Sequence, residues 1–68
     1  MTTTTHQHTT EKYYISIEQE NTLLTVSVCP FISDRLYGYP IIKATYHHTE
    51  LDKAIRTFKR YIKKYSEV

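Results

Sequence analysis

The spacing of the apolar residues changes once along this 68-residue chain, and this change limits the fold more than any other feature. Up to about residue 46, apolar and polar residues alternate in short runs, which is the period of half-buried β-strands. Beyond residue 49 the apolar residues recur every three or four positions, which is the period of an amphipathic helix. We therefore predict an α+β domain with antiparallel strands first and one helix at the end.

Three segments have the alternation of strands. The first runs from Lys12 to Glu18, and the second comprises residues 24–29. The second strand should end at Pro30, because proline cannot donate a hydrogen bond to a neighbouring strand. The third strand is predicted from Ile41 to Tyr46 and contains β-branched residues, which strands favour. Its predicted inward-facing side chains are Ile42, Ala44 and Tyr46.

Residues 31–39 are predicted to form a loop. The segment follows Pro30, precedes Pro40 and holds the only glycine of the chain, Gly38. It also holds large apolar side chains, which we expect to cap one end of the core. These side chains are Phe31, Ile32, Leu36 and Tyr37.

The helix is predicted to start near Thr49 and to run to about Tyr65. Thr49 and Asp52 have the spacing of a capping box, and acidic residues favour the positive end of a helix dipole. The apolar residues of this segment form the stripe of a helix that packs on a sheet. They are Leu51, Ala54, Ile55, Phe58, Tyr61, Ile62 and Tyr65.

Together these elements predict a three-stranded antiparallel sheet, in β-β-β-α order, with the helix on one face. The opposite face of the sheet, which carries Tyr14, Glu18 and Lys43, would then meet solvent or a partner. Residues 1–10 are Thr, His and Gln after the initiator, and we expect a flexible tail there. Residues 11–68 would form a single small domain.

No arrangement of residues predicts catalysis, a cofactor or a metal site. A domain of this size buries only about 60% of its unfolded surface and has little room for a substrate cavity. Cys29 is the only cysteine, and no general base is placed beside it by any recognised motif. The four histidines lack a Cys or carboxylate at the spacing of a tetrahedral site. They are His6, His8, His47 and His48.

The sequence has no apolar run near the roughly 20 residues of a membrane span and no secretory signal, so we expect a cytoplasmic protein. The formal net charge of +2 selects neither an acidic protein nor a nucleic acid as partner.

Charge segregation is the strongest functional signal. The last third of the chain holds six of the nine basic residues, with no acid between them, on the side of the helix opposite the apolar stripe. They could bind phosphates or an acidic protein surface, or they could form a solvated helix back. These residues are Lys53, Arg56, Lys59, Arg60, Lys63 and Lys64.

Aromatic side chains suggest where a protein partner would be anchored. We expect the anchors in the loop at Tyr37 and Tyr39 and on the open face at Tyr14, with Arg35 assisting. The alternative is that these tyrosines belong to the core or its rim.

We therefore predict a non-catalytic regulator or inhibitor that docks on a protein with an acidic surface. In size and style, though not in motif, the chain resembles small phage and mobile-element products that block host machinery, including nucleic-acid machinery. The alternative is a nucleic-acid-binding domain that uses the basic face of the helix. A homodimer could form through the edge of the first predicted strand or through the open sheet face.

Overall fold

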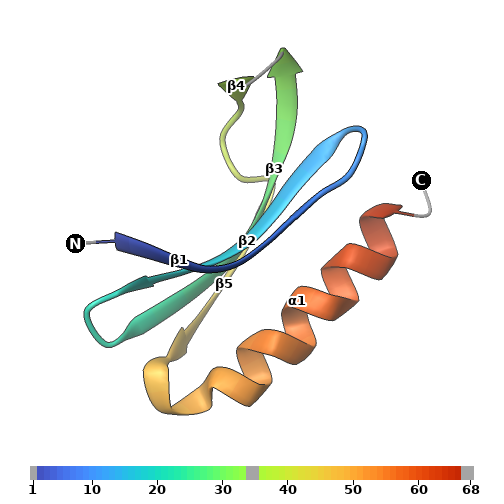
Figure 1. Cartoon of the computed structure of the whole chain (residues 1–68). Helices are drawn as coiled ribbons and strands as arrows, with labels where there is room; N and C mark the ends of the chain where they lie inside the picture. Colours follow the sequence, from blue (N-terminus) through green and yellow to red (C-terminus); the bar gives the residue numbers. More distant parts are fainter. Residues whose placement is uncertain (1, 34–35, 67–68) are drawn as a thin grey trace.

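The computed structural model describes residues 2–33 and 36–66, and in this part of the chain a five-stranded antiparallel sheet carries one C-terminal helix on one face (Figure 1). The α+β class and the final helix are as predicted. The strands are β1 Thr2–Thr9, β2 Tyr13–Glu20, β3 Leu23–Ser33, β4 Leu36–Tyr37 and β5 Ile42–His47. They are followed by the 3-10 helix η1, His48–Glu50, and by the helix α1, Leu51–Ser66.

The long strand β3 is the centre of the sheet. One of its edges pairs with the whole of β2, from Leu23 opposite Glu20 to Pro30 opposite Tyr13. Its other edge pairs first with β5 and then, beyond Pro30, with the short strand β4. Figure 1 shows that the end of β3 and β4 form a hairpin that extends beyond the rest of the sheet. The same strand therefore belongs to the body of the domain and to a projecting hairpin.

The prediction of three strands is wrong, because residues 2–9 form β1 where a flexible tail is expected, and Leu36–Tyr37 form β4 inside the predicted loop of residues 31–39. β1 pairs antiparallel with β2, from Thr2 opposite Glu20 to Thr9 opposite Tyr14, with an irregularity between Thr4 and His6. Threonine is β-branched and favours extended backbone even when no apolar residue marks the strand. The first predicted strand is consequently an inner strand, so its edge is not open to a second copy.

The prediction that a strand ends at Pro30 is also wrong, since β3 continues to Ser33. Pro30 accepts a hydrogen bond from the Gly38 amide through its carbonyl oxygen, at 2.8 Å, on the edge that faces β4. Its missing N–H falls on the same edge, where pairing passes from β5 to β4. Proline costs no ladder hydrogen bond at such an interruption.

The hydrophobic core lies between the sheet and α1, which contacts β2, β3 and β5. The core residues are Ile15, Ile17, Leu24, Val26, Val28, Ala54, Phe58 and Tyr61. The predicted inward face of the third strand is confirmed for β5, since Ile42 and Tyr46 pack against this core. Thr57, which the apolar pattern does not include, is also buried and shares a 2.6 Å hydrogen bond with the Tyr46 hydroxyl.

The helix start differs from the predicted capping box at Thr49 and Asp52. The His47 ring nitrogen accepts a hydrogen bond from the Thr49 amide at 3.3 Å, and the Glu50 carboxylate accepts one from the His47 amide at 3.4 Å. These bonds satisfy free N–H groups of η1, two residues earlier than predicted. Among the described residues, no helix has both the length and the apolar character needed to cross a membrane.

Candidate interaction surfaces

All six predicted basic residues are exposed and lie on the outer side of α1. At 100° per residue they fall within an arc of about 140°, centred nearly opposite Ala54 and Tyr61, which are buried against the sheet. We call this set the cationic face: Lys53, Arg56, Lys59, Arg60, Lys63 and Lys64.

The ion pairs of the described residues lie around the start of α1, where acids of η1 and of the first turn of α1 engage two members of the cationic face. The Lys53 ammonium lies 2.9 Å from the Glu50 carboxylate, and the Arg56 guanidinium lies 3.5 Å from Asp52. The hydrogen bond from Lys53 lowers the pKa of Glu50, and the same bond raises the pKa of Lys53. Within the described residues, Lys59, Arg60 and Lys63 have no such carboxylate partner. Among the described residues, the positive charge is therefore least neutralised in the second half of the helix.

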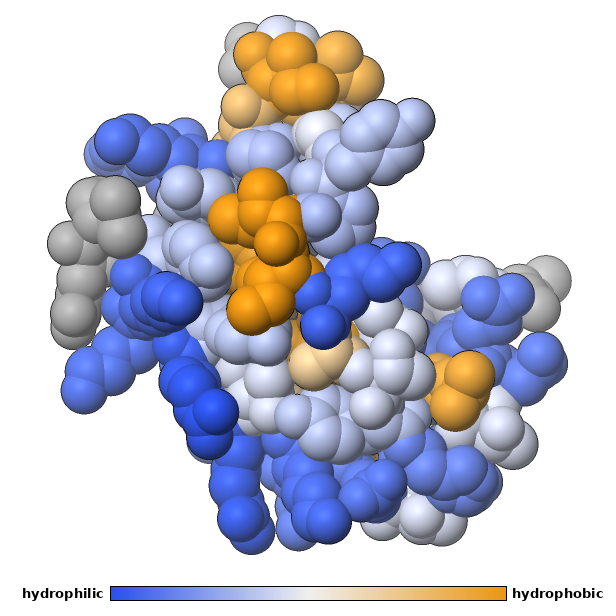
Figure 2. Space-filling model, turned by 180° about the vertical axis from the view of Figure 1, so that it is seen from behind, coloured by the Kyte–Doolittle hydropathy of each residue, from blue (hydrophilic) through white to orange (hydrophobic). Residues whose placement is uncertain are grey.

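A second surface lies at the end of the projecting hairpin. Tyr39 is 94% exposed, Ile32 66%, Leu36 53% and Tyr37 42%. We call these four residues the apolar tip. Figure 2 shows hydrophobic surface at this end of the molecule, away from the hydrophilic side where α1 lies. A hollow of about 440 Å³ beside the tip is lined by Ile32, Tyr37, Gly38, Tyr39 and Pro40.

The prediction that the large side chains of residues 31–37 cap the core is wrong for the exposed ones. The hairpin turns away from α1, so Ile32 and Leu36 have no sheet or helix to pack against. Phe31 remains half-buried and lies 4.9 Å from the Tyr37 ring, centroid to centroid. The Tyr37 ring therefore contacts Phe31, while the residue as a whole stays exposed.

Of the predicted anchors, Tyr37 and Tyr39 belong to the apolar tip and Tyr14 supports it. The Tyr14 ring stacks on Tyr37 at 4.6 Å, and its hydroxyl donates to the Gln7 side-chain oxygen at 3.0 Å. Burial, followed by the nearby charge of Glu18, raises the pKa of Tyr14. Arg35, the fourth predicted residue, lies outside the described residues. The structure thus brings two predicted anchors together and places a third beneath them.

The open face of the sheet is more enclosed at its centre than the sequence suggests. Ser16 and Ser27 lie side by side in a row across the sheet, between Gln7 on β1 and Lys43 on β5, and both are buried. Longer side chains on every side cover these small residues. The Ser16 hydroxyl has no hydrogen-bond partner among the described residues. A shallow hollow of about 230 Å³ next to this row is lined by Thr2, Glu18, Glu20, Thr25, Ser27, Pro40 and Lys43.

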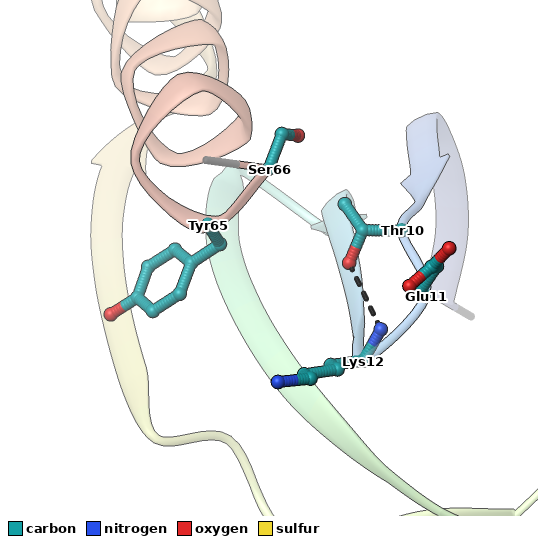
Figure 3. Close-up of a pocket in the computed structure, with 5 residues that line it drawn as sticks. All are labelled: Thr10, Glu11, Lys12, Tyr65 and Ser66. Atoms are coloured by element: carbon teal, nitrogen blue, oxygen red, sulfur yellow. Dashed lines mark hydrogen bonds between the residues drawn. The ribbon is translucent and has the colours of Figure 1, made fainter. Parts of the chain in front are cut away.

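A further hollow, of about 300 Å³, lies between the β1–β2 turn and the end of α1 (Figure 3). Thr10, Glu11, Lys12, Tyr65 and Ser66 line it. The Thr10 hydroxyl accepts hydrogen bonds from the amides of Lys12 at 3.3 Å and Tyr13 at 2.9 Å. Because these bonds close the turn, the hydroxyl already has structural partners. The hollow shows no converging set of reactive side chains.

The histidines and Cys29 do not form a reactive cluster in the described part of the chain. No group of three His, Cys, Asp or Glu side chains there is placed to hold a metal. The His6 ring lies 5.8 Å from Phe58, and the His47 and His48 rings lie 4.4 Å apart. Burial raises the pKa of the Cys29 thiol, which disfavours the thiolate that a nucleophile requires.

Comparison with known proteins adds no relative. No family model matches the chain, and neither a curated protein nor a solved structure is similar to it at a significant level. The interpretation of the cationic face and the apolar tip rests on their own chemistry.

Proposed function

We propose that this chain is a small non-catalytic binding protein that docks on a protein partner through the apolar tip. The observation that carries the proposal is the exposure of Ile32, Leu36 and Tyr39 on a hairpin that projects from the domain. Large apolar side chains that cluster at one exposed place mark interaction sites more often than those scattered singly. A small domain gains no stability from such a cluster.

The chemistry of the tip favours a protein surface with an apolar groove. Apart from Asp34 and Arg35, which lie outside the described residues, the hairpin and the following loop, 31–41, carry no charged side chain. The hairpin projects beyond the rest of the sheet, so a groove on the partner could enclose it. Tyrosine gives a large contact area for a small loss of side-chain freedom and is enriched among residues that dominate binding energy. Tyr39 is the most exposed aromatic residue of this surface.

The partner that we propose also has an acidic surface beside the groove. The cationic face would accelerate the approach of such a partner. A regulator or inhibitor of nucleic-acid machinery, in the manner of small phage or mobile-element products, is the role that we propose for this binding.

Photo-crosslinking from the tip tests this proposal directly. A photoreactive aromatic amino acid at position 39 should link the chain to one specific protein in its native cells. The same amino acid at position 23 is the matched control, because Leu23 is 50% exposed but lies at the β2–β3 turn. Equal labelling from both positions would contradict the proposal. Crosslinks between two copies of the chain would indicate a homodimer in place of a separate partner. The molecular mass in solution would then be that of two chains.

The purified crosslinked protein then allows the affinity to be measured. Tyr39→Ala should weaken binding at least about 30-fold, which corresponds to the 2 kcal/mol typical of a dominant interface residue. Leu23→Ala should leave the affinity unchanged. If both variants bind as tightly as the original chain, the tip is not the docking surface.

A further inference from the structure

We propose that the cationic face of α1 binds the phosphodiester backbone of nucleic acid without reading its sequence. This activity is separate from protein docking, because it uses a different element and a different chemistry. It does not depend on the proposed function of the apolar tip.

The first step of the argument is the concentration of unneutralised charge. Lys59, Arg60 and Lys63 follow one another on the exposed side of α1 without a carboxylate partner among the described residues. Lys64 adds a fourth charge, with its ammonium 5.5 Å from the centre of the Tyr65 ring. Like charges four residues apart destabilise a helix, and Arg56 with Arg60, and Lys59 with Lys63, have this spacing. These repulsions oppose helix formation, whereas the helix dipole favours Lys63 and Lys64 in the last turn.

The second step concerns dimensions. From Arg56 to Lys64 the helix advances about 12 Å, at a rise of 1.5 Å per residue. A DNA duplex presents a phosphate about every 3.4 Å along each strand, so a similar length of one strand offers three or four phosphates. A helix laid along the backbone could thus set the five cations of this stretch, Arg56 included, against three or four phosphates. The phosphates would repel the acids on the open face of the sheet, Glu18 and Glu20. Only the helix side of the domain would therefore contact the nucleic acid.

The third step distinguishes nucleic acid from other anionic surfaces. Protein interfaces are depleted in lysine and need an apolar centre, but four of the six cations here are lysines and no large apolar residue of the helix lies among them. A membrane-binding helix inserts its apolar face, but the apolar face of α1 is packed on the sheet. Binding to phosphates needs neither feature, because released counterions provide most of the affinity.

The test is the salt dependence of binding, measured by fluorescence anisotropy with labelled mixed-sequence duplexes of DNA and of RNA. Four phosphate contacts predict a slope of about −3.6 for the logarithm of the binding constant against the logarithm of the salt concentration on DNA. In Lys59→Gln/Arg60→Gln the slope should become shallower by about two. A comparable slope on both duplexes would indicate that the chain binds the backbone of DNA and RNA alike. Binding to one duplex alone would show which of the two nucleic acids is the ligand.

The matched control is Lys12→Gln/Lys43→Gln, which removes the same charge from the β1–β2 turn and the open face. This variant should keep the original slope, and Ile32→Ser/Leu36→Ser should also bind both duplexes normally. The proposal is overturned if both charge variants lose binding equally, because net charge alone would then explain it. It is also overturned if neither duplex is bound at about 50 mM salt, or if only phosphatidylserine vesicles are bound.

Discussion

The two ends of strand β3 have the same backbone conformation but opposite roles. Leu24, Val26 and Val28 in the first half are buried under α1, whereas Ile32 beyond Pro30 is 66% exposed. The first half lies between β2 and β5 and faces the helix, whereas the end pairs with the two-residue strand β4. The difference teaches that a large apolar side chain stabilises this domain only where a second layer covers it. Where the layer ends, the same kind of residue is available for binding.

The largest expected effect compares two truncations on this one strand. Leu24→Ala should lower the free energy of unfolding by about 2–5 kcal/mol, because it removes a fully buried side chain and leaves a cavity. Ile32→Ala should change it by no more than about 0.5 kcal/mol, as expected at an exposed position. Urea unfolding followed by circular dichroism measures both values.

If Ile32→Ala lowers the free energy of unfolding by more than about 1 kcal/mol, the two halves of β3 do not differ as proposed, because the tip is then part of the cooperative core. Leu51→Ala is a suitable control, since Leu51 is 41% exposed at the start of α1. It separates the effect of the hairpin from that of removing any exposed apolar residue.

Hydrogen exchange should show the same division in the backbone. The Gly38 amide donates to Pro30 at 2.8 Å, a hydrogen bond as short as those expected inside the sheet. It should nevertheless exchange about a hundredfold faster than the amides of the first half of β3, because the hairpin can open without unfolding the core. Exchange measured by NMR in native conditions gives both rates. Similar rates would mean that the hairpin and the core open together.

A smaller effect is expected from the hydrogen bond that joins α1 to β5. The Tyr46 hydroxyl and the Thr57 hydroxyl are 2.6 Å apart, and Thr57 is buried. Tyr46→Phe and Thr57→Val should each destabilise the domain by about 1–2 kcal/mol, because each leaves one partner unsatisfied. The double variant should cost less than the sum of the two. Additive effects in this double-mutant cycle would show that the two hydroxyls do not stabilise one another.

The sequence predicts the helix-covered part of the fold well and the rest poorly, for physical reasons. The stripe through Phe58 and the inward face of β5 follow from side-chain periodicity, because burial under a second layer selects apolar residues. β1 could not be found this way, since an edge strand of threonine and histidine needs only backbone pairing with β2. Thr57 was missed because its burial depends on a hydroxyl partner on another element.

The two candidate surfaces differ in the same way, because the sequence predicts one of them and not the other. The cationic face could be predicted, because helical spacing alone decides which charges share a side. The exposure of Ile32 and Leu36 could not, because it depends on where β3 leaves the cover of α1. Pro30 marks the place on β3 where the hairpin begins. The sequence pattern, however, predicts the end of a strand there and not the start of a hairpin.

Cys29 lies on β3 just before Pro30, and its reactivity provides the finest test of where the two halves divide. Burial raises the pKa of its thiol, so less thiolate is present at a given pH than in the unfolded chain. The rate of alkylation by iodoacetamide should therefore rise at a higher pH in the native protein than in urea. Glu18 also raises this pKa, and Glu18→Gln should move the native profile slightly back toward lower pH. If the native and urea profiles coincide, Cys29 is exposed by frequent opening, and the part of β3 that opens without global unfolding begins before Pro30 instead of after it.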